Sequence, residues 1–404
     1  MTTTAPIDWD AFAGSVRPTC EDTPEVEALR TRIRGVLGRH LDSERLTRHD
    51  EEEIFDAELY TALAEEGLIQ LEAELDGRAA SHVSQTTVLE EVAAAATSVA
   101  VACVVQYMGV ELLHSYADRA QRETYLAPLF DGRWRMSFGL SEPDGGTDVA
   151  RAMKTRAVRR DDGSYVINGA KKWIGGASTA DFLLVLARTS EIERSSIDGI
   201  TMFIVPRSAP GITTTAIDTM GIRALEQADV RFEDVVVGAD SILGEADQGF
   251  RQVLRTLNGE RLNAAAVALG IARGALDFAV GYVRQREAFG RPVGAFQGLQ
   301  HQLVEVSVKV ESARLLLANA ARSSDGAHSG ANETLSAMAK LAASDAATST
   351  TDVGMRAMGG WGFLRQLPMQ RYFRDARLYT FAPLTDEMIR NYIGEQHLGL
   401  PRSY

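Results

Sequence analysis

The sequence predicts an α+β protein, mostly helical, in which a helical N-terminal domain precedes a middle antiparallel β domain and a C-terminal helical bundle. Apolar residues recur at spacings of three and four over residues 24–133, which is the period of a helix. Residues 135–243 are broken by Gly, Pro and Asp and hold short β-branched and aromatic runs, which indicate strands. From residue 249 the helical period returns. We therefore expect three domains, over residues 1–133, 134–244 and 245–404.

The N-terminal domain is expected to hold helices behind a poorly ordered tail. Residues 1–24 are polar and contain two prolines, so we expect them to be poorly ordered. Thr23 precedes a helical pattern, and its hydroxyl is suited to capping the first turn. Residues 84–117 are too apolar and Ala-rich for a surface and predict one or two internal helices. Cys103 lies within them and is expected to be a small core residue.

The middle domain is expected to be a sheet that opens with an unusual turn. The runs DFLLVLART, ITMFIVP and ADVRFEDVVV have the composition of strands. In FGLSEPDGGTDVA, Pro143 fixes φ and two glycines permit unusual backbone angles, so a turn there leaves N–H groups and hydroxyls free for a ligand; a plain hairpin turn is the alternative. The pair Asn168-Gly169 predicts a hairpin before Trp173. Small residues after Trp173 leave space for a flat ring.

The C-terminal domain is expected to be built from long helices. Three helical segments cover residues 249–285, 296–324 and 332–358. The polar, Gly-rich stretch between the last two is expected to be a loop.

Composition excludes several classes of function. The net charge is −13 and the pI is near 5.1, which argues against a general nucleic-acid binder. The two cysteines form no metal-ligand spacing and no disulfide framework, so no metal site is expected. The N-terminus shows no signal peptide, and no uninterrupted apolar run is long enough for a membrane span. We therefore expect a cytoplasmic protein.

Four motifs, in order and spacing, resemble the acyl-CoA dehydrogenase superfamily of flavoproteins. They are SEPDGGTD, INGAKKWI, QREAFGRPVGAFQGLQH and GGWGFLRQLPMQRYFRDAR. The resemblance covers about residues 25–400. It implies an N-terminal helical domain, a middle β domain and a C-terminal four-helix bundle, assembled as a homodimer or homotetramer. It also implies FAD held between the β domain and the bundle, with part of the nucleotide contacted by a neighbouring subunit.

The resemblance also implies which residues hold the ligands. The flavin ring system is expected to lie against Phe138, Leu140 and Ser141 at its pyrimidine edge and against Trp173 and Gly175 at the isoalloxazine. Arg286 and Phe289 are expected to reach FAD across the subunit interface. Near the dinucleotide lie Arg356, Gly359 and Gly360, and on a turn near the flavin lie Thr385 and Glu387. For the thioester substrate they are Thr147 and Arg261.

Two of these positions depart from the pattern of the superfamily. Many relatives carry Thr or Ser where this chain has Gly175, so only a backbone N–H remains near flavin N5. A Gln is common at the position of Arg356, which either adds charge near the FAD phosphates or points outward.

The third departure concerns the catalytic base. Many members remove the α-proton with a Glu at the head of the turn after the RDA motif, and the corresponding residue is Pro383, which cannot accept a proton. A minority, including isovaleryl- and long-chain-type enzymes, carry this Glu on a bundle helix directly before an Arg, as Glu260 stands here. Glu260 is thus the predicted base; the alternatives are Asp386 or Glu387, and no carboxylate base at all.

The resemblance implies an FAD-dependent dehydrogenase that oxidises the α,β C–C bond of an acyl thioester and passes electrons to an electron-transferring flavoprotein or a similar acceptor. The last 24 residues resemble a subgroup of specialised biosynthesis, so an acyl carrier protein is as acceptable a substrate carrier as CoA. A flavin-dependent monooxygenase or oxidase on the same fold is the first alternative. A catalytically silent binding subunit is the second.

Overall fold

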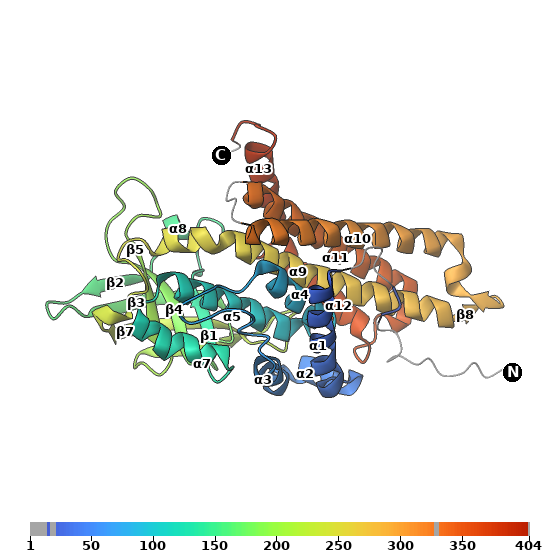
Figure 1. The fold of residues 1–404 in the computed structure, drawn as a ribbon, viewed down its shortest axis with the longest axis horizontal. Coiled ribbons are helices and arrows are strands. Elements are labelled where there is room, and N and C mark those ends of the chain that lie inside the picture. Colours follow the sequence, from blue (N-terminus) through green and yellow to red (C-terminus); the bar gives the residue numbers. More distant parts are fainter. Residues whose placement is uncertain (1–13, 17–21, 327–330, 403–404) are drawn as a thin grey trace.

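The computed structural model describes residues 14–16, 22–326 and 331–402. The predicted fold class is confirmed, because helices, a sheet and a helical bundle follow one another in this order. The sheet occupies one end of an elongated molecule, and the bundle extends from it to the opposite end (Figure 1). The prediction of poor order for residues 1–24 falls mostly outside the described residues, as does Cys20.

The N-terminal part is helical, and its start was predicted. Pro24 begins the first helix, and the Thr23 hydroxyl accepts a hydrogen bond from the Val26 N–H at 3.4 Å, as expected of a cap. Cys103 is fully buried. The helices are α1 (Pro24–His40), α2 (Ser43–Glu52), α3 (Ala57–Glu65), α4 (His82–Ala93), α5 (Thr97–Tyr116), α6 (Arg119–Gln121) and α7 (Ala127–Phe130).

The middle part is a seven-stranded sheet in the order β1-β4-β2-β3-β7-β6, with β5 paired to β4. Its elements are β1 (Met136–Gly139), α8 (Val149–Ala152), β2 (Arg156–Arg159), β3 (Tyr165–Gly175), β4 (Phe182–Arg188), β5 (Ile200–Pro206), β6 (Ile212–Ile217) and β7 (Gln227–Val237). Most pairs are antiparallel as predicted, but β1 and β2 run parallel to β4. The sheet is therefore mixed, because long connections rather than tight turns bring these strands beside β4.

The predicted hairpin at Asn168-Gly169 is wrong. Strand β3 passes straight through this pair, with a register shift against β7 between Ile167 and Gly169. Gly169 has φ of +151°, and a Cβ there would lie 2.6 Å from the Thr155 Cα. The glycine therefore serves a β-bulge and a close approach to the neighbouring backbone instead of a turn.

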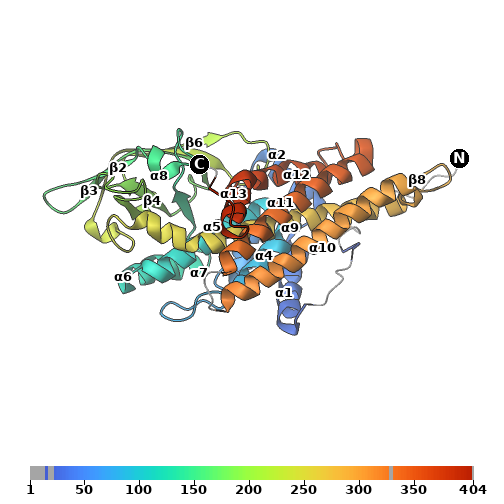
Figure 2. The same cartoon turned by 90° about the horizontal axis from the view of Figure 1, so that it is seen from above.

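The C-terminal part is built around α9, which runs from the sheet to the far end of the molecule (Figures 1 and 2). The helices α9, α10, α11 and α12 form the bundle, and one hydrophobic core joins them to α1, α3, α4 and α5. The elements are α9 (Gly249–Gln285), β8 (Glu287–Ala288), β9 (Arg291–Pro292), α10 (Gln297–Asp325), α11 (Ala331–Met358), α12 (Pro368–Ala376) and α13 (Asp386–Gln396).

Two described helical segments are long and apolar enough to cross a membrane by length and composition, Thr97–Tyr116 and Asn258–Gln285. Of their most apolar windows, 67% and 83% is buried inside the fold. Packing in the core accounts for their apolar character.

Candidate functional site

The predicted base lies on α9 where this helix passes α5 and α13. Glu260 is half-buried, and burial raises the pKa of its carboxyl to about 7, although the charge of Arg261 acts in the opposite direction. Arg261 is buried, and its guanidinium carbon lies 4.7 Å from the ring centroid of Tyr392 on α13. A carboxyl that titrates near neutrality is suited to accept and release a proton.

The turn that carries Pro383 is held by side chains of α11. The Asp386 carboxylate accepts hydrogen bonds from Lys340 Nζ at 2.7 Å and Ser344 Oγ at 2.8 Å, both on α11. Lys340 is 1% exposed and also donates to the Leu384 carbonyl at 2.9 Å. Asp386 is therefore engaged in a buried ion pair that fixes the turn.

Thr385 and Glu387, the other residues predicted near the flavin on this turn, differ in their surroundings. Thr385 is the N-cap of α13 and accepts a hydrogen bond from the Met388 N–H at 3.2 Å. The Glu387 side chain is 78% exposed and lies 3.6 Å from Arg390. An exposed carboxylate of this kind is poorly placed to take a proton from a substrate carbon, so the geometry favours Glu260 over both turn carboxylates.

The residues predicted for the flavin's pyrimidine edge gather where β1 ends beside β3. Phe138 and Leu140 are partly buried, and the Ser141 carbonyl accepts a hydrogen bond from the Lys172 N–H at 2.9 Å. Trp173 follows on β3, with φ of +63° and 56% of its surface exposed. Thr147 is exposed in the turn that follows Ser141.

Gly175 lies at the end of β3 and lines a pocket between α5 and the sheet. Its carbonyl accepts a hydrogen bond from Ser137 Oγ at 2.7 Å. A Cβ at Gly175 would stand 3.4 Å from the Gln227 side chain, and the adjacent Gly176 has φ of +66°. The pocket is lined by Phe55, Ala102, Val105, Gln106, Arg135, Met136, Gly175, Gly176, Thr179 and Leu225.

A buried ion pair that the sequence analysis missed holds the predicted ligand turn. Lys171 is fully buried and donates to Glu142 Oε1 at 2.8 Å and to the Leu140 carbonyl at 3.1 Å. Glu142 also accepts the backbone N–H groups of Lys154 and Thr155. The sequence held a sign of this pair, because the alternation of side chains along the strand places Lys171 on its inward-facing side, where a charged group needs a partner.

The remaining predicted FAD residues lie away from this region. Arg286 and Phe289 belong to the β8–β9 hairpin at the opposite end of the molecule from the sheet (Figure 1). Phe289 is 94% exposed with φ of +54°, and Arg286 is exposed. Within one chain these residues cannot contact a ligand held at the sheet, as expected if they serve a neighbouring subunit.

Arg356, Gly359 and Gly360 lie at the end of α11, which runs back antiparallel to α10. Arg356 pairs with Asp352 on the same helix at 3.0 Å and is mostly exposed, so within this chain it points outward. Gly359 has φ of +56°, and no atom lies within 4 Å of a Cβ built on either glycine. Their surface is open to a ligand or to another subunit.

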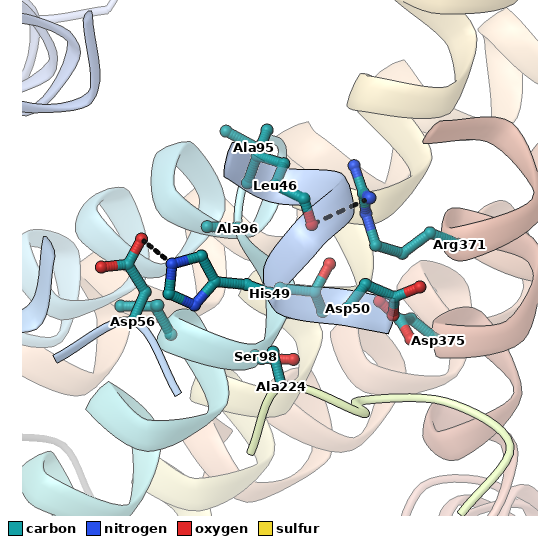
Figure 3. A pocket seen from close by; sticks show the side chains of 12 residues that line it. Leu46, His49, Asp50, Asp56, Ala95, Ala96, Ser98, Ala224, Arg371 and Asp375 are labelled. Carbon is teal, nitrogen blue, oxygen red and sulfur yellow. Dashed lines mark hydrogen bonds and ion pairs between the residues drawn. The ribbon is translucent and has the colours of Figure 1, made fainter. Parts of the chain in front are cut away.

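A second pocket lies between α2, the α4–α5 turn and α12 (Figure 3). Arg371 Nη1 donates to the Leu46 carbonyl at 3.4 Å, and His49 Nε2 lies 3.8 Å from Asp56. Burial raises the pKa of Asp375 to about 6, although its hydrogen bond from the Ile222 N–H acts in the opposite direction. None of the predicted site residues lines this pocket, and its charged groups tie α12 to α2.

Comparison with known proteins gives the same three-part division. Family models described as the N-terminal, middle and C-terminal domains of acyl-CoA dehydrogenase match residues 23–133, 137–235 and 247–398. The short-chain specific acyl-CoA dehydrogenase of Bos taurus mitochondria is 36% identical over 347 residues, covering 84% of this chain and 82% of the relative.

Two solved structures illustrate the likeness in fold. Butyryl-CoA dehydrogenase from Megasphaera elsdenii is 31% identical with a TM-score of 0.86, covering 92% of this chain and 97% of that one. The prolyl acyl carrier protein oxidase AnaB is 25% identical with a TM-score of 0.86, covering 94% of this chain and 100% of that one.

Proposed function

Because the chain belongs to the acyl-CoA dehydrogenase family and is thus an oxidoreductase acting on CH–CH groups, we propose that it is an FAD-dependent dehydrogenase of an acyl thioester with Glu260 as its base. The choice of Glu260 as base depends on the surroundings of the three other candidate positions. Pro383 has no proton acceptor, Asp386 is held in a buried ion pair, and Glu387 is exposed. Burial brings the pKa of Glu260 to about 7, within the range in which a carboxyl can take up and release a proton.

The residues around β3 fit a bound flavin. Trp173 offers an exposed aromatic face, and the glycines after it leave space that a Cβ would fill. Ser141 is half-buried and Thr147 is exposed in the turn before α8, where their hydroxyls can meet a ligand. Phe138, Leu140, Ser141 and Trp173 would hold the ring system. When bound, FAD accepts the β-hydrogen of the substrate as a hydride.

The protein's own part in the reaction is to hold the substrate and take the α-proton. Glu260 would receive this proton at a carboxylate oxygen, and displacement of water by the substrate would favour the protonated form further. Pro383 has no N–H and so offers no hydrogen bond to the thioester carbonyl at its position. Loss of one such donor costs about 3 kcal/mol of transition-state stabilisation in other enzymes, so this active site is expected to use other donors.

The proposal also covers the group that carries the acyl chain and the protein that accepts the electrons. Similarity to a prolyl acyl carrier protein oxidase supports a carrier-bound substrate as much as a CoA ester. We further propose an electron-transferring flavoprotein or a similar protein as acceptor, and a homodimer or homotetramer in which the β8–β9 hairpin reaches the neighbouring subunit's FAD. Cytoplasmic localisation stays a prediction.

An anaerobic titration of the FAD-loaded protein with acyl-CoA and acyl carrier protein thioesters tests the proposal. We expect a thioester to bleach the flavin of the wild type, and Glu260→Gln to bind the same thioester while its flavin stays oxidised. Glu387→Gln is the matched control and should bleach like the wild type. Equal bleaching of the wild type and Glu260→Gln would refute the role of Glu260.

An oxygen-dependent oxidase is the second candidate, because AnaB is an oxidase and Gly175 leaves only a backbone N–H near flavin N5. Rapid reoxidation of the thioester-reduced flavin by O₂, with formation of peroxide, would favour it over the dehydrogenase.

A further inference from the structure

Lys171 of β3 is a fully buried lysine whose ammonium group lies beside the end of β1. Its Nζ donates to the Leu140 carbonyl at 3.1 Å and to Glu142 Oε1 at 2.8 Å. Burial lowers the pKa of Lys171 to about 8, although Glu142 acts in the opposite direction. A buried ion pair is often no more stabilising than apolar residues of the same volume. We therefore looked for a role of Lys171 at the carbonyl that it holds.

The peptide bond between Leu140 and Ser141 is held in one orientation by this lysine. In a trans peptide the N–H points to the side opposite the carbonyl, and the Leu140 carbonyl is turned to Lys171. The Ser141 N–H therefore points away from the buried ammonium, and no backbone carbonyl of the described residues accepts it. The Ser141 carbonyl accepts the Lys172 N–H at 2.9 Å. Two successive residues of β3 thus fix the backbone on both sides of Ser141.

Glu142 keeps the ammonium of Lys171 in place. Its Oε1 also accepts the Thr155 N–H at 3.0 Å, and its Oε2 accepts the Lys154 N–H at 2.6 Å. Only 3% of the Glu142 side chain is exposed, so water does not replace these partners. The carboxylate is therefore tied to the backbone that follows α8, and the ammonium paired with it cannot leave the Leu140 carbonyl without breaking a buried ion pair.

Ser141 is among the residues that would hold the pyrimidine edge of the flavin in the proposed function. This edge carries carbonyl oxygens and ring nitrogens that accept hydrogen bonds, and it gains negative charge when the flavin is reduced. A donor that is already oriented towards a developing charge stabilises it without reorganisation. Hydrogen bonds to this part of a cofactor also tune its affinity for electrons. A fixed Ser141 N–H would therefore favour the reduced flavin.

We propose that Lys171 is a positioning residue for the cofactor: by holding the Leu140 carbonyl, it directs the Ser141 N–H to the pyrimidine edge of FAD and raises the reduction potential of the bound flavin. The proposal rests on FAD as the cofactor and is independent of Glu260 as the base. Lys171 makes no contact with substrate in this role. Glu142 acts through Lys171, so the loss of this carboxylate alone has less effect on the flavin than the loss of the lysine.

Two variants separate the hydrogen bond to Leu140 from the ion pair. Glu142→Gln removes the ion pair and keeps the lysine, whereas Lys171→Met combined with Glu142→Gln removes both and keeps the net charge of the wild type. The reduction potential of the FAD-loaded protein is measured against a reference dye, with dithionite as reductant and no thioester. We expect the double variant to favour reduced over oxidised FAD about ten-fold less than the wild type, which is about 30 mV for a two-electron couple. Glu142→Gln should not lower the potential.

Ser141→Pro is a second test that leaves the buried pair in place. It removes the N–H itself, so we expect it to lower the potential as the double variant does. A Ser141→Pro variant with the potential of the wild type would overturn the proposal, even if the double variant fails to fold.

Lys154→Met is the matched control, because this lysine pairs with Asp144 at 2.7 Å in an exposed ion pair beside the same turn. It should leave the potential unchanged. Urea unfolding of each FAD-loaded variant separates a change in the flavin from a change in stability. Equal lowering of the potential in Glu142→Gln and the double variant would overturn the positioning role, as would a double variant with the potential of the wild type. A protein that binds no FAD would refute the cofactor itself, whereas the titration of Glu260→Gln with thioesters does not affect this measurement.

Discussion

Replacing Glu260 by Gln is expected to stabilise the folded protein, and to do so more at pH 8 than at pH 5. The fold raises the pKa of this carboxyl from 4.5 to about 7, so it favours the protonated form. Stability from such a group is fully present below its unfolded pKa and is lost as the pH rises through the folded value. At about 1.4 kcal/mol per pH unit, this difference corresponds to roughly 3 kcal/mol at pH 8.

The expected gain is smaller than this limit because Glu260 is half-buried and coupled to Glu111. Two interacting carboxyls titrate as a pair, and water screens part of their charge. We therefore expect the gain in the free energy of unfolding of Glu260→Gln over the wild type to be about 2 kcal/mol larger at pH 8 than at pH 5. Glutamine has the same shape and no charge, so the pH dependence isolates the ionisation.

Urea unfolding at fixed FAD and protein concentration, followed by tryptophan fluorescence, measures this difference. Glu387→Gln is the control, because its exposed carboxylate should give the same small effect at both pH values. A variant that is no more stable than the wild type at pH 8 would refute the reasoning, because Glu260 would then ionise in the fold without cost.

Two other substitutions test the elements that support the site. Lys340→Met should lower the free energy of unfolding by about 3–5 kcal/mol, because it leaves the buried Asp386 carboxylate unpaired. The control is Lys309→Met, which removes an exposed pair with Asp345 and should cost less than about 1 kcal/mol in the same urea assay. Equal costs would show that the buried pair is not required. Trp173→Ala should lose flavin several-fold more readily on dialysis, measured by the ratio of flavin to protein absorbance, because an aromatic contact contributes about 0.5–1.5 kcal/mol. Unchanged flavin content would place the ring elsewhere.

The sequence was sufficient for features that depend on local patterns. The order of helices and strands, the Thr23 cap and the buried Cys103 follow from periodicity and composition over short windows. The mixed sheet and the straight course of β3 through Asn168-Gly169 did not follow, because a turn signal is overridden when the flanking residues pair with another strand.

Features that join distant residues were beyond local patterns. His82, Glu111, Gly259 and Asp325 come from four different helices and lie close together in the fold. Their spacing in the sequence does not predict this cluster. The Lys340–Asp386 pair likewise joins α11 to the start of α13. Such pairs become visible only when tertiary packing removes their charges from water and requires each to find a partner.

The structure also shows how the turn after the RDA motif is held in place with Pro383 at its head. Lys340 holds both the Leu384 carbonyl and the Asp386 carboxylate, and Thr385 caps the helix that follows, so three successive residues of the turn are fixed by its surroundings. The carboxylate fixed there, Asp386, is occupied by its ion pair with Lys340 and its hydrogen bond from Ser344. The α9 helix brings Glu260 into a half-buried position, and the next residue, Arg261, stacks on Tyr392 of α13. Since α13 begins at the anchored turn, the buried Lys340–Asp386 pair also positions the helix that Arg261 contacts.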